Sequence, residues 1–357
     1  MKIALDCRYV RVDRHDGISR YTVGLVAALA GLVGDRHDLV LLVSDPGQLA
    51  HLPDLPTHPV SAPTSAREPL VARQVNAARP DVVFSPMQTM GSWGRRYPLV
   101  LTLHDLIYYR NRTPPPEFAA PIRLLWRLFH LAWWPQRTLL NRADAVVTVS
   151  ATTAALIAEH RLTRRPVTVV PNAPDPLPDR PRGERTGALV YMGSFMPYKN
   201  VGTLAAAMGS LPDHELHLMS RVPDAERARL TALAGGGRLV FHDGVTDEAY
   251  HDLLRRATAL VTASRDEGFG IPLVEAMGLG TPVVVSDIPV FREVGGAAAA
   301  YVDADDVAGF VRAVRELDDP DEWARRSAAG LSRAAHYSWE SSARVLLALL
   351  ERVAAAR

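Results

Sequence analysis

The amino-acid sequence predicts an α/β protein made of two doubly wound domains that face each other across a cleft. Two observations lead to this fold: short apolar runs alternate with helical patterns in both halves of the chain, and a proline-rich stretch divides the halves. The length of 357 residues suits two domains, because single domains cluster at about 100 to 200 residues. Parallel sheets bind ligands outside the carboxyl ends of their strands, so we expect the functional site at the cleft.

The first domain is predicted to span residues 1–173. Its strands are short apolar runs bounded by turn residues, at 3–5, 39–43, 82–84, 99–103, 145–149 and 167–170. Helical patterns over 18–32 and 152–160 lie between these runs, as parallel βαβ units require.

Five prolines fall within residues 171–181, which excludes a helix or a central strand there and places the linker at 174–184. The second domain is predicted over 185–340, with strands at 189–192, 216–219, 239–241, 260–262 and 282–286. Residues 341–357 are predicted to form a C-terminal helix that packs back towards the first domain through one apolar face.

The composition is that of an ordinary globular protein, with 48% apolar and 22% charged residues. Cys7 is the only cysteine, and no secretion signal opens the chain, so a cytoplasmic location is expected. The most apolar stretch, residues 124–134, is too short and too interrupted to span a membrane. Nucleic acid is not an expected partner.

The strongest motif is Ser-Arg-Asp-Glu-Gly-Phe-Gly-Ile-Pro-Leu-Val-Glu, residues 264–275, which follows the predicted strand 260–262. Pro272 suits the first turn of a helix, and that turn is expected to hold Glu275. A helix start offers backbone N–H groups and a positive dipole end to a diphosphate or a sugar hydroxyl. Glu267 and Glu275 then accept hydrogen bonds from two parts of one ligand. The alternative is an ordinary helix start with acidic residues in its first turn.

A second motif, Val-Tyr-Met-Gly-Ser-Phe-Met-Pro-Tyr-Lys-Asn over residues 190–200, opens the second domain. Lys199 is one of only two lysines in the chain, against 38 arginines. A lysine presents a compact charge to phosphate oxygens, whereas the planar fork of arginine imposes another geometry. The alternative is a solvated surface lysine.

The first domain supplies two further candidates. Gly17 opens a helix after the first strand, where the backbone can approach a phosphate, and no Gly-x-Gly-x-x-Gly motif is present to indicate a dinucleotide-binding dehydrogenase. His104 ends the strand at 99–103 and faces the predicted cleft, with Asp105 available to orient its ring. The alternative for His104 is a purely structural histidine.

Together these motifs resemble glycosyltransferase family 4, a retaining family with the GT-B fold of two Rossmann-like domains, and its bacterial mannosyltransferase-like members in particular. The resemblance implies that Glu267 contacts the transferred sugar, Lys199 the donor diphosphate and Glu275 the ribose. It implies a catalytic set of His104, Lys199 and Glu267. It implies a donor-binding set of Gly17, Gly193, Ser194, Lys199, Arg265, Gly268, Phe269, Gly270, Ile271, Pro272, Leu273 and Glu275.

One position departs from the family pattern. Many relatives carry an arginine directly after the glycine at 193, also on the diphosphate, whereas this chain has Ser194. Arg265 and Arg221 are the candidates for a second cation, because both follow neighbouring predicted strands.

The resemblance implies transfer of a hexosyl group, foremost mannose from GDP-mannose, to a hydroxyl of a glycan or lipid-linked acceptor, in the biosynthesis of cell-envelope polysaccharide or glycolipid. Asp303-Ala304-Asp305 has the letters of an Asp-x-Asp metal motif but lies past the last core motif, so no metal and no cofactor are expected. Two alternatives stay open: a nucleotide-sugar epimerase on the same fold, and a non-catalytic nucleotide-sugar binding protein.

Residues 123–137, Arg-Leu-Leu-Trp-Arg-Leu-Phe-His-Leu-Ala-Trp-Trp-Pro-Gln-Arg, combine tryptophan with arginine. That pairing is typical of a peripheral membrane contact, here with the inner face of the membrane. Apolar residues on nearly every side of 124–134 instead favour a helix buried in the first domain.

Overall fold

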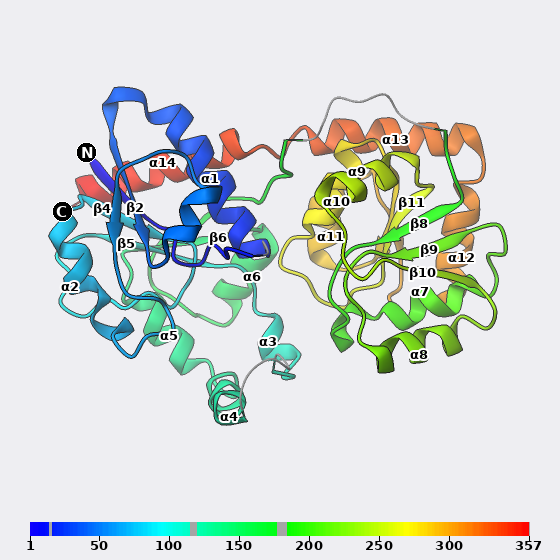
Figure 1. The fold of residues 1–357 in the computed structure, drawn as a ribbon, viewed down its shortest axis with the longest axis horizontal. Coiled ribbons are helices and arrows are strands. Elements are labelled where there is room, and N and C mark those ends of the chain that lie inside the picture. The colour runs from blue at the N-terminus through cyan, green and yellow to red at the C-terminus, as the bar shows by residue number, and fades with distance from the viewer. Residues whose placement is uncertain (14–15, 115–119, 177–183, 357) are drawn as a thin grey trace. The chain divides into compact units, whose positions relative to one another are not determined.

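The computed structural model describes residues 1–13, 16–114, 120–176 and 184–356. The chain divides into two compact units, drawn in Figure 1: Met1–Ala173 together with Ser338–Arg357, and Pro174–Tyr337. Most of the linker expected at 174–184 lies outside the described residues, as do Arg14 and His15 beside Gly17.

The first unit is built on a parallel sheet of seven strands in the order β3-β2-β1-β4-β5-β6-β7. The strands are β1 Lys2–Asp6, β2 Asp38–Val43, β3 Thr57–Pro59, β4 Val82–Ser85, β5 Leu99–Leu103, β6 Ala145–Thr148 and β7 Val167–Val169. The strand order reverses between β1 and β4, and ligands of doubly wound sheets bind at such a reversal. Six of these strands were predicted, and the edge strand β3 was missed.

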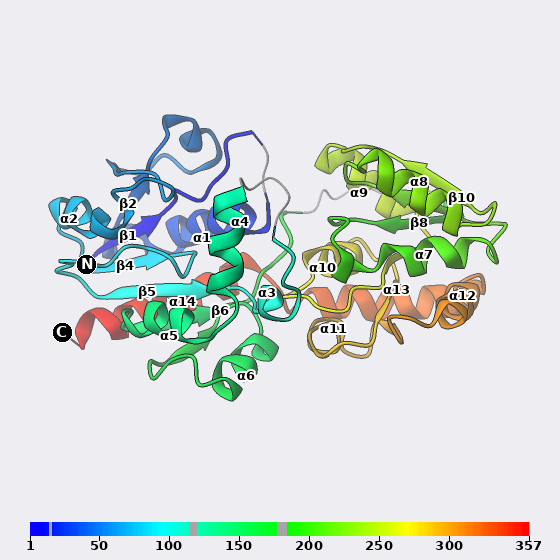
Figure 2. The same cartoon turned by 90° about the horizontal axis from the view of Figure 1, so that it is seen from below.

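The α-helices of the first unit are α1 Gly17–Val33, α2 Val71–Val75, α3 Ile107–Arg110, α4 Ala120–Phe129, α5 Trp134–Asn141, α6 Ala151–Glu159 and α14 Trp339–Ala355. Short 3-10 turns cover Gly34–Arg36, Pro46–His51, Glu68–Leu70 and Asn76–Ala78. The C-terminal α14 lies alongside α1, as Figures 1 and 2 show. A Cβ atom at Gly24 of α1 would lie 2.3 Å from the Trp339 ring, so this close packing requires glycine.

The prediction of one buried helix over 124–134 is wrong in two respects. The helix α4 ends at Phe129, and a second helix, α5, begins at Trp134. Leu124, Leu125 and Leu128 are exposed to 61%, 68% and 55%. No helix within the described residues is long and apolar enough to cross a bilayer.

The second unit holds a parallel sheet of six strands in the order β10-β9-β8-β11-β12-β13, which reverses between β8 and β11. The strands are β8 Ala188–Tyr191, β9 Glu215–Leu218, β10 Arg238–Phe241, β11 Ala259–Thr262, β12 Val283–Ser286 and β13 Ala300–Val302. The edge strand β13 was not predicted; it is only three residues long, and only Val302 is buried.

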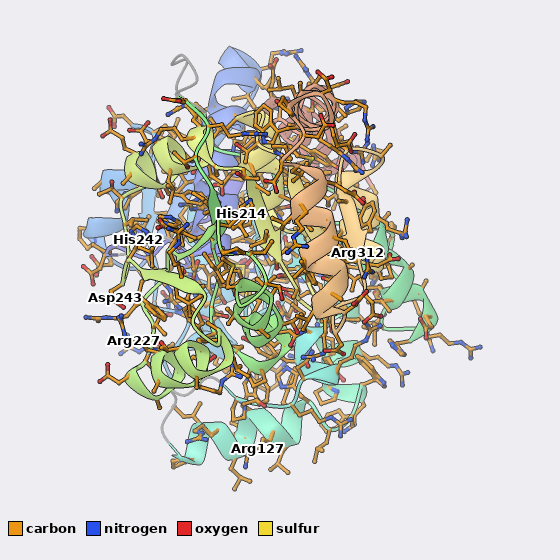
Figure 3. All side chains as sticks on the ribbon, turned by 90° about the vertical axis from the view of Figure 1, so that its right-hand side faces the viewer. Arg127, His214, Arg227, His242, Asp243 and Arg312 are labelled. Atoms are coloured by element: carbon orange, nitrogen blue, oxygen red, sulfur yellow. The ribbon has the colours of Figure 1, made fainter. Side chains whose placement is uncertain are left out.

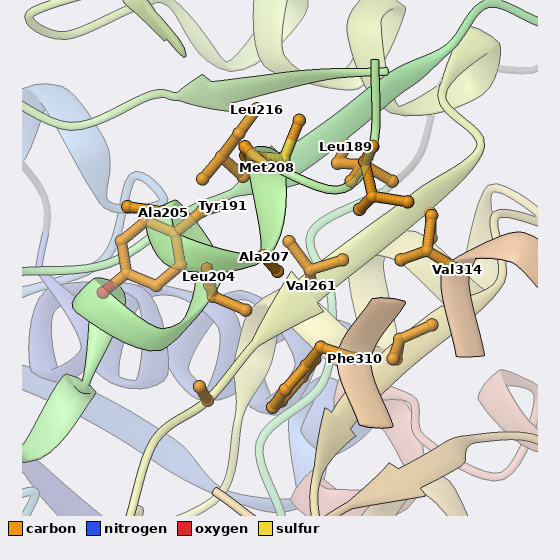
Figure 4. Close-up of a cluster of buried hydrophobic side chains, with 14 of the residues drawn as sticks. Leu189, Tyr191, Leu204, Ala205, Ala207, Met208, Leu216, Val261, Phe310 and Val314 are labelled. Atoms are coloured by element: carbon orange, nitrogen blue, oxygen red, sulfur yellow. The ribbon is translucent and has the colours of Figure 1, made fainter. Parts of the chain in front are cut away.

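The α-helices of the second unit are α7 Val201–Met208, α8 Asp224–Leu233, α9 Asp247–Arg256, α10 Ile271–Gly278, α11 Pro289–Gly295, α12 Val307–Glu316 and α13 Pro320–Ala334. A 3-10 turn covers Pro197–Lys199. The helices α7, α8 and α12 bury apolar side chains against the strands in the core drawn in Figure 4. This core fixes the strand ends from which the second unit's candidate residues project.

Candidate functional site

Two of the predicted catalytic residues, Lys199 and Glu267, meet in the second unit. Lys199 follows β8 and Glu267 follows β11, and these strands are neighbours at the point where the strand order reverses. Lys199 Nζ donates to Glu267 Oε1 at 2.5 Å, and each side chain is 15% exposed. Two charges removed this far from water need such pairing, because either one alone would be poorly solvated.

Ser264, the first residue of the motif 264–275, completes this cluster, although sequence reasoning assigned it no role. Its hydroxyl, fully buried, donates to Glu267 Oε1 at 2.9 Å. The same oxygen therefore accepts from an ammonium and from a hydroxyl, which fixes the orientation of the Glu267 carboxylate.

The backbone around Lys199 is held from several sides. The turn Pro197–Lys199 ends at Asn200, a left-handed residue with φ of 52°, whose side-chain amide donates to the Ala304 carbonyl at 2.6 Å. The Arg265 amide donates to the Tyr198 carbonyl at 2.8 Å, which ties the loop after β11 to the turn. Gly193 lies so close to Tyr191 that a Cβ atom there would stand 2.8 Å from the phenolic oxygen.

The helix start predicted at 270–272 is present. Gly270, with φ of 98°, precedes α10, Pro272 lies in the first turn, and no side chain caps the helix. A Cβ atom at Gly270 would also lie 2.9 Å from the Phe291 ring. The N-cap position of α10 therefore supplies no side-chain acceptor to the first N–H groups, and the positive end of the helix dipole lies at Gly270.

Glu275 does not lie in the first turn of α10, which was expected to hold it. The helix begins at Ile271 and its first turn contains no acidic residue, so Glu275 belongs to the second turn. Its side chain is 1% exposed, whereas Glu267 is open to solvent on one side. The idea of an ordinary helix start with acidic residues in its first turn is therefore wrong, and the ribose role of Glu275 stays a prediction.

The remaining donor-binding candidates of this loop differ in exposure. Gly268, Ile271 and Pro272 are partly exposed. Phe269 and Leu273 are buried, with the Phe269 ring edge-on to Tyr337 at 5.4 Å between ring centres. Ile271 and Pro272 can therefore contact a donor with their side chains, whereas Gly268 and Phe269 have their backbone to offer.

The two candidates for a second cation follow the strands on either side of β8. Arg221 follows β9 and is exposed. Arg265 follows β11, is 45% exposed and is paired with Asp305. Ser194 is exposed, and its carbonyl accepts from Tyr191 Oη at 2.6 Å. Arg265 would have to leave Asp305 to reach a ligand near Lys199.

His104 lies in the first unit, at the end of β5. Its Nε2 lies 2.8 Å from the Pro86 carbonyl, which can only accept, so Nε2 carries the proton and Nδ1 is left as an acceptor. The Tyr21 ring stands edge-on at 5.0 Å. Burial lowers the pKa of His104 below its ordinary value of 6.5, so the ring is neutral at pH 7.

The Pro86 carbonyl thus orients His104, and sequence reasoning did not anticipate it. Asp105 Oδ1 accepts from the Ile107 amide at 3.0 Å at the start of α3. The orienting role predicted for Asp105 stays a prediction. A cavity of about 120 Å³ borders His104, and Tyr109, His130 and Gln136 also line it.

Gly17 is the first residue of α1, as predicted, and it is exposed. The space beside it is open, because a Cβ atom there would meet nothing within 4 Å. Asp16 caps the helix by accepting from the Ser19 amide at 2.8 Å, and Arg11 pairs with Asp16 at 2.8 Å. The Asp16 carboxylate therefore already occupies an N–H group at the start of α1 that a phosphate could otherwise bind.

A buried charged network at the reversal between β1 and β4 was also missed. Arg8, 4% exposed, binds Asp6 at 2.8 Å and Glu68 at 2.6 Å. The Ser85 hydroxyl donates to Asp6 at 2.9 Å, and Glu68 accepts from the Gly91 amide at 3.0 Å. The sequence signal that could have led to this network is the pair of charged residues Asp6 and Arg8, which follow the apolar run 3–5. This network fixes the strand ends and the loop near Gly91.

No group of three or more histidine, cysteine, aspartate or glutamate side chains suited to hold a metal ion occurs in the parts of the chain that the structure describes.

Two doubly wound parallel units in one chain define the GT-B class of proteins. Residues 15–176 match the family model described as Glycosyltransferase Family 4, and residues 186–319 match the model described as Glycosyl transferases group 1. The chain belongs to glycosyltransferase family 4.

Bacterial mannosyltransferases are among its relatives. The O-antigen chain mannosyltransferase RfbU of Salmonella typhimurium is 30% identical over 242 residues, which are 63% of this chain and 62% of that protein. The MMP alpha-(1->4)-mannosyltransferase of Mycolicibacterium hassiacum is 30% identical over 277 residues, which are 72% of this chain and 66% of that protein. Both matches span less than two thirds of the relative's own length.

Among solved structures, sucrose-phosphate synthase (tll1590) from Thermosynechococcus elongatus superposes over the whole of both chains with a TM-score of 0.77 and 20% identity. A likeness at this identity shows the shared fold.

Proposed function

We propose that the protein transfers a mannosyl group from GDP-mannose to a hydroxyl of a glycan or lipid-linked acceptor, with retention of the anomeric configuration. The observation that carries the proposal is the Lys199–Glu267 pair, which lies at adjacent strand ends of the same unit as the uncapped start of α10. The donor sugar is proposed from the two mannosyltransferase relatives. A cytoplasmic location with contact to the inner leaflet belongs to the same proposal.

The leaving diphosphate is the group that needs stabilisation, because negative charge develops on it as the bond to the sugar breaks. Lys199 and the start of α10 are held by fixed backbone beside one another's strand ends, so once the diphosphate has replaced Glu267 as the partner of Lys199 these groups need little further rearrangement in the transition state. One such donor contributes about 3 kcal/mol. When a phosphate oxygen takes over Lys199, Ser264 still holds Glu267 in place, and Glu267 can accept from a hydroxyl of the sugar.

The role proposed for His104 is that of a neutral acceptor. With its proton on Nε2, the ring offers the Nδ1 lone pair to a substrate hydroxyl. We propose that the acceptor oxygen bonds to the anomeric carbon on the face from which the diphosphate leaves, and that the diphosphate takes the acceptor proton. This step uses no enzyme nucleophile and no metal ion.

The test is a panel of nucleotide sugars in a thermal-shift assay, since a ligand that binds the folded state raises stability by RT ln(1 + [L]/Kd). GDP-mannose is expected to raise Tm more than UDP-glucose or UDP-N-acetylglucosamine, with and without EDTA. NMR of the product anomeric proton then reports retention or inversion. Conversion of the donor alone would indicate an epimerase, and donor binding without turnover of any acceptor would indicate a binding protein.

A further inference from the structure

The helix α4 and the residues after it expose a cluster of large apolar side chains. Among the described residues thirteen such side chains are exposed, and six of them fall within residues 122–134. We call these six the α4 surface: Ile122 (53% exposed), Leu124 (61%), Leu125 (68%), Leu128 (55%), Leu131 (58%) and Trp134 (67%). Soluble proteins seldom gather so many apolar side chains in one exposed place without a partner for them.

The helix is attached to its unit by its aromatic side. The Trp126 ring is edge-on to Tyr108 at 5.0 Å between ring centres, and the Trp133 ring stacks on Tyr109 at 3.9 Å. His130 lies between these contacts, 5.0 Å from the Tyr109 ring. The aromatic contacts therefore orient the segment so that the leucines face away from the unit.

The position of α4 agrees with this orientation. Figure 1 shows α4 projecting from the lower end of the first unit, and Figure 2, seen from below, shows it nearest the viewer. Figure 3 labels Arg127, which lies on the same helix. Arg123 and Arg127 are four residues apart and thus share one side, while Leu124 and Leu128 share another.

The charge around the α4 surface has one sign. Residues 106–114 and 120–143 contain six arginines and no aspartate or glutamate. Arg123 and Arg127 are exposed beside the leucines. Exposed apolar side chains with exposed arginines beside them match the chemistry of a lipid leaflet, which offers acyl chains at one depth and anionic headgroups just above them.

We propose that the α4 surface rests on an anionic lipid leaflet, with its leucines and Trp134 among the acyl chains and Arg123 and Arg127 at the headgroups. The cavity beside His104 lies behind this surface, because His130, directly after α4, is one of its lining residues. If the proposed function holds, an acceptor anchored in that leaflet brings its polar end to the His104 cavity without leaving the membrane.

The test is cosedimentation of the full chain with vesicles of phosphatidylcholine, alone or mixed with phosphatidylglycerol, at low and moderate salt. Three variants are compared with the parent. The first is the triple variant Leu124→Gln, Leu125→Gln, Leu128→Gln, and the second is the double variant Arg123→Gln, Arg127→Gln. The third, Leu49→Gln with Leu70→Gln, is a matched control, because these leucines are each 39% exposed in the same unit. Circular dichroism and Tm confirm that each variant is folded.

The parent is expected to bind the anionic vesicles more tightly than the neutral ones and to lose binding as salt rises. The leucine triple variant should bind at least ~10-fold more weakly, the arginine variant should lose the preference for anionic lipid, and the control should match the parent. Absence of parent binding at low salt, or equal binding by the triple variant, would overturn the proposal.

Light scattering without lipid addresses a second copy of this chain as the occupant. A dimer that the triple variant abolishes would assign the α4 surface to self-association and overturn the lipid assignment. No donor or acceptor is present in either experiment, so a failure here is separate from a failure of the proposed transferase activity.

Discussion

The Lys199–Glu267 pair is the residue-scale feature from which the proposed chemistry follows. Without a ligand, each charge serves as the other's partner in a partly buried place, and Ser264 holds the carboxylate from a second direction. A donor diphosphate can replace Glu267 as the partner of Lys199, so the pair is arranged to exchange one anion for another. This exchange requires both charges, and neither of them is needed for the packing of the unit's core.

We predict that Lys199→Ala and Glu267→Gln each lower turnover at least ~100-fold while the protein stays folded, because both groups act on charge that develops in the transition state. Initial rates at saturating donor, together with Tm, measure this. Arg325→Ala is the control, since it removes an exposed ion pair with Glu322 on α13, and exposed ion pairs contribute little to stability. A parent-like rate in either site variant would remove that residue from the mechanism.

We predict that the lowered pKa of His104 sets the acid limit of activity. Its desolvated ring stays neutral in the folded protein at pH values where an ordinary histidine, with a pKa of 6.5, is half protonated. If neutral Nδ1 accepts a substrate hydrogen bond, kcat/KM should stay flat from about pH 8 down to about pH 6.5 and fall only below that. A pH–rate profile that already declines above pH 6.5, with the fold intact, would contradict this role.

The same shift has a consequence for stability. The unfolded chain binds a proton at His104 near pH 6.5, whereas the folded protein resists it. The neutral His104 ring therefore makes its full contribution to the free energy of unfolding above pH 6.5. This contribution declines as pH falls from 6.5 towards the lowered folded-state pKa. His130, His217 and His242 are shifted in the same direction, mainly by burial, and contribute with the same sign.

At the scale of elements, sequence periodicity predicted the buried strands and missed one edge strand of each sheet, β3 and β13. A central strand such as β5, Leu99–Leu103, is buried at every position and therefore reads as a continuous apolar run. The edge strand β3, Thr57–Pro59, has two exposed residues and a proline, and it carries no such run. The edge strands β7 and β10 do carry apolar runs and were predicted, so the missing signal belongs to the sequence of β3 rather than to its place at an edge.

The helix α4 shows a second limit of sequence reasoning. Apolar residues on nearly all sides of 124–134 favoured burial, yet the structure buries only the aromatic side against Tyr108 and Tyr109. The face of an apolar helix that packs against the protein is determined by the side chains of the neighbouring segment. Such tertiary contacts cannot be deduced from the periodicity of the helix itself. For the same reason the motifs led to Lys199 and Glu267, whereas Ser264 and the Pro86 carbonyl became visible only through their distances.

The start of α1 provides an element-scale prediction. Gly17 has open space where a Cβ atom would lie, so neither packing nor backbone conformation requires glycine. Gly17→Ala should leave Tm unchanged or slightly raised but weaken donor binding about 10-fold if a ligand approaches this backbone. Gly31→Ala, also exposed and with nothing within 4 Å, is the matched control on the same helix and should leave binding unchanged. Parent-like donor affinity in Gly17→Ala would exclude this helix start from the site.

At the scale of the whole molecule, the chain begins and ends in the same unit. Residues Ser338–Arg357 leave the second unit and complete the first, where α14 packs along α1. Leu346, Leu349 and Leu350 of α14 are at most 2% exposed. The Ser342 hydroxyl donates to the Pro171 carbonyl at 2.8 Å, next to the point where the first unit ends. The integrity of the first unit therefore depends on a segment that lies more than a whole domain away in sequence.

We therefore predict that deletion of residues 338–357 unfolds the first unit and leaves donor binding by the second unit in place. Fully burying a leucine contributes about 1.5 to 3 kcal/mol, so losing three of them removes a large part of the roughly 5 to 15 kcal/mol that stabilises a typical protein. Leu346→Ala should lower stability by about 2 to 5 kcal/mol, whereas Val345→Ala, at a position 41% exposed on the same helix, should change it little. Thermal unfolding of the truncated chain, with and without GDP-mannose, measures the loss of the first unit and the donor binding that remains. In the truncated chain one transition should disappear, and the other should still shift with the donor. A truncated protein that unfolds like the parent would show that α14 is dispensable to the first unit.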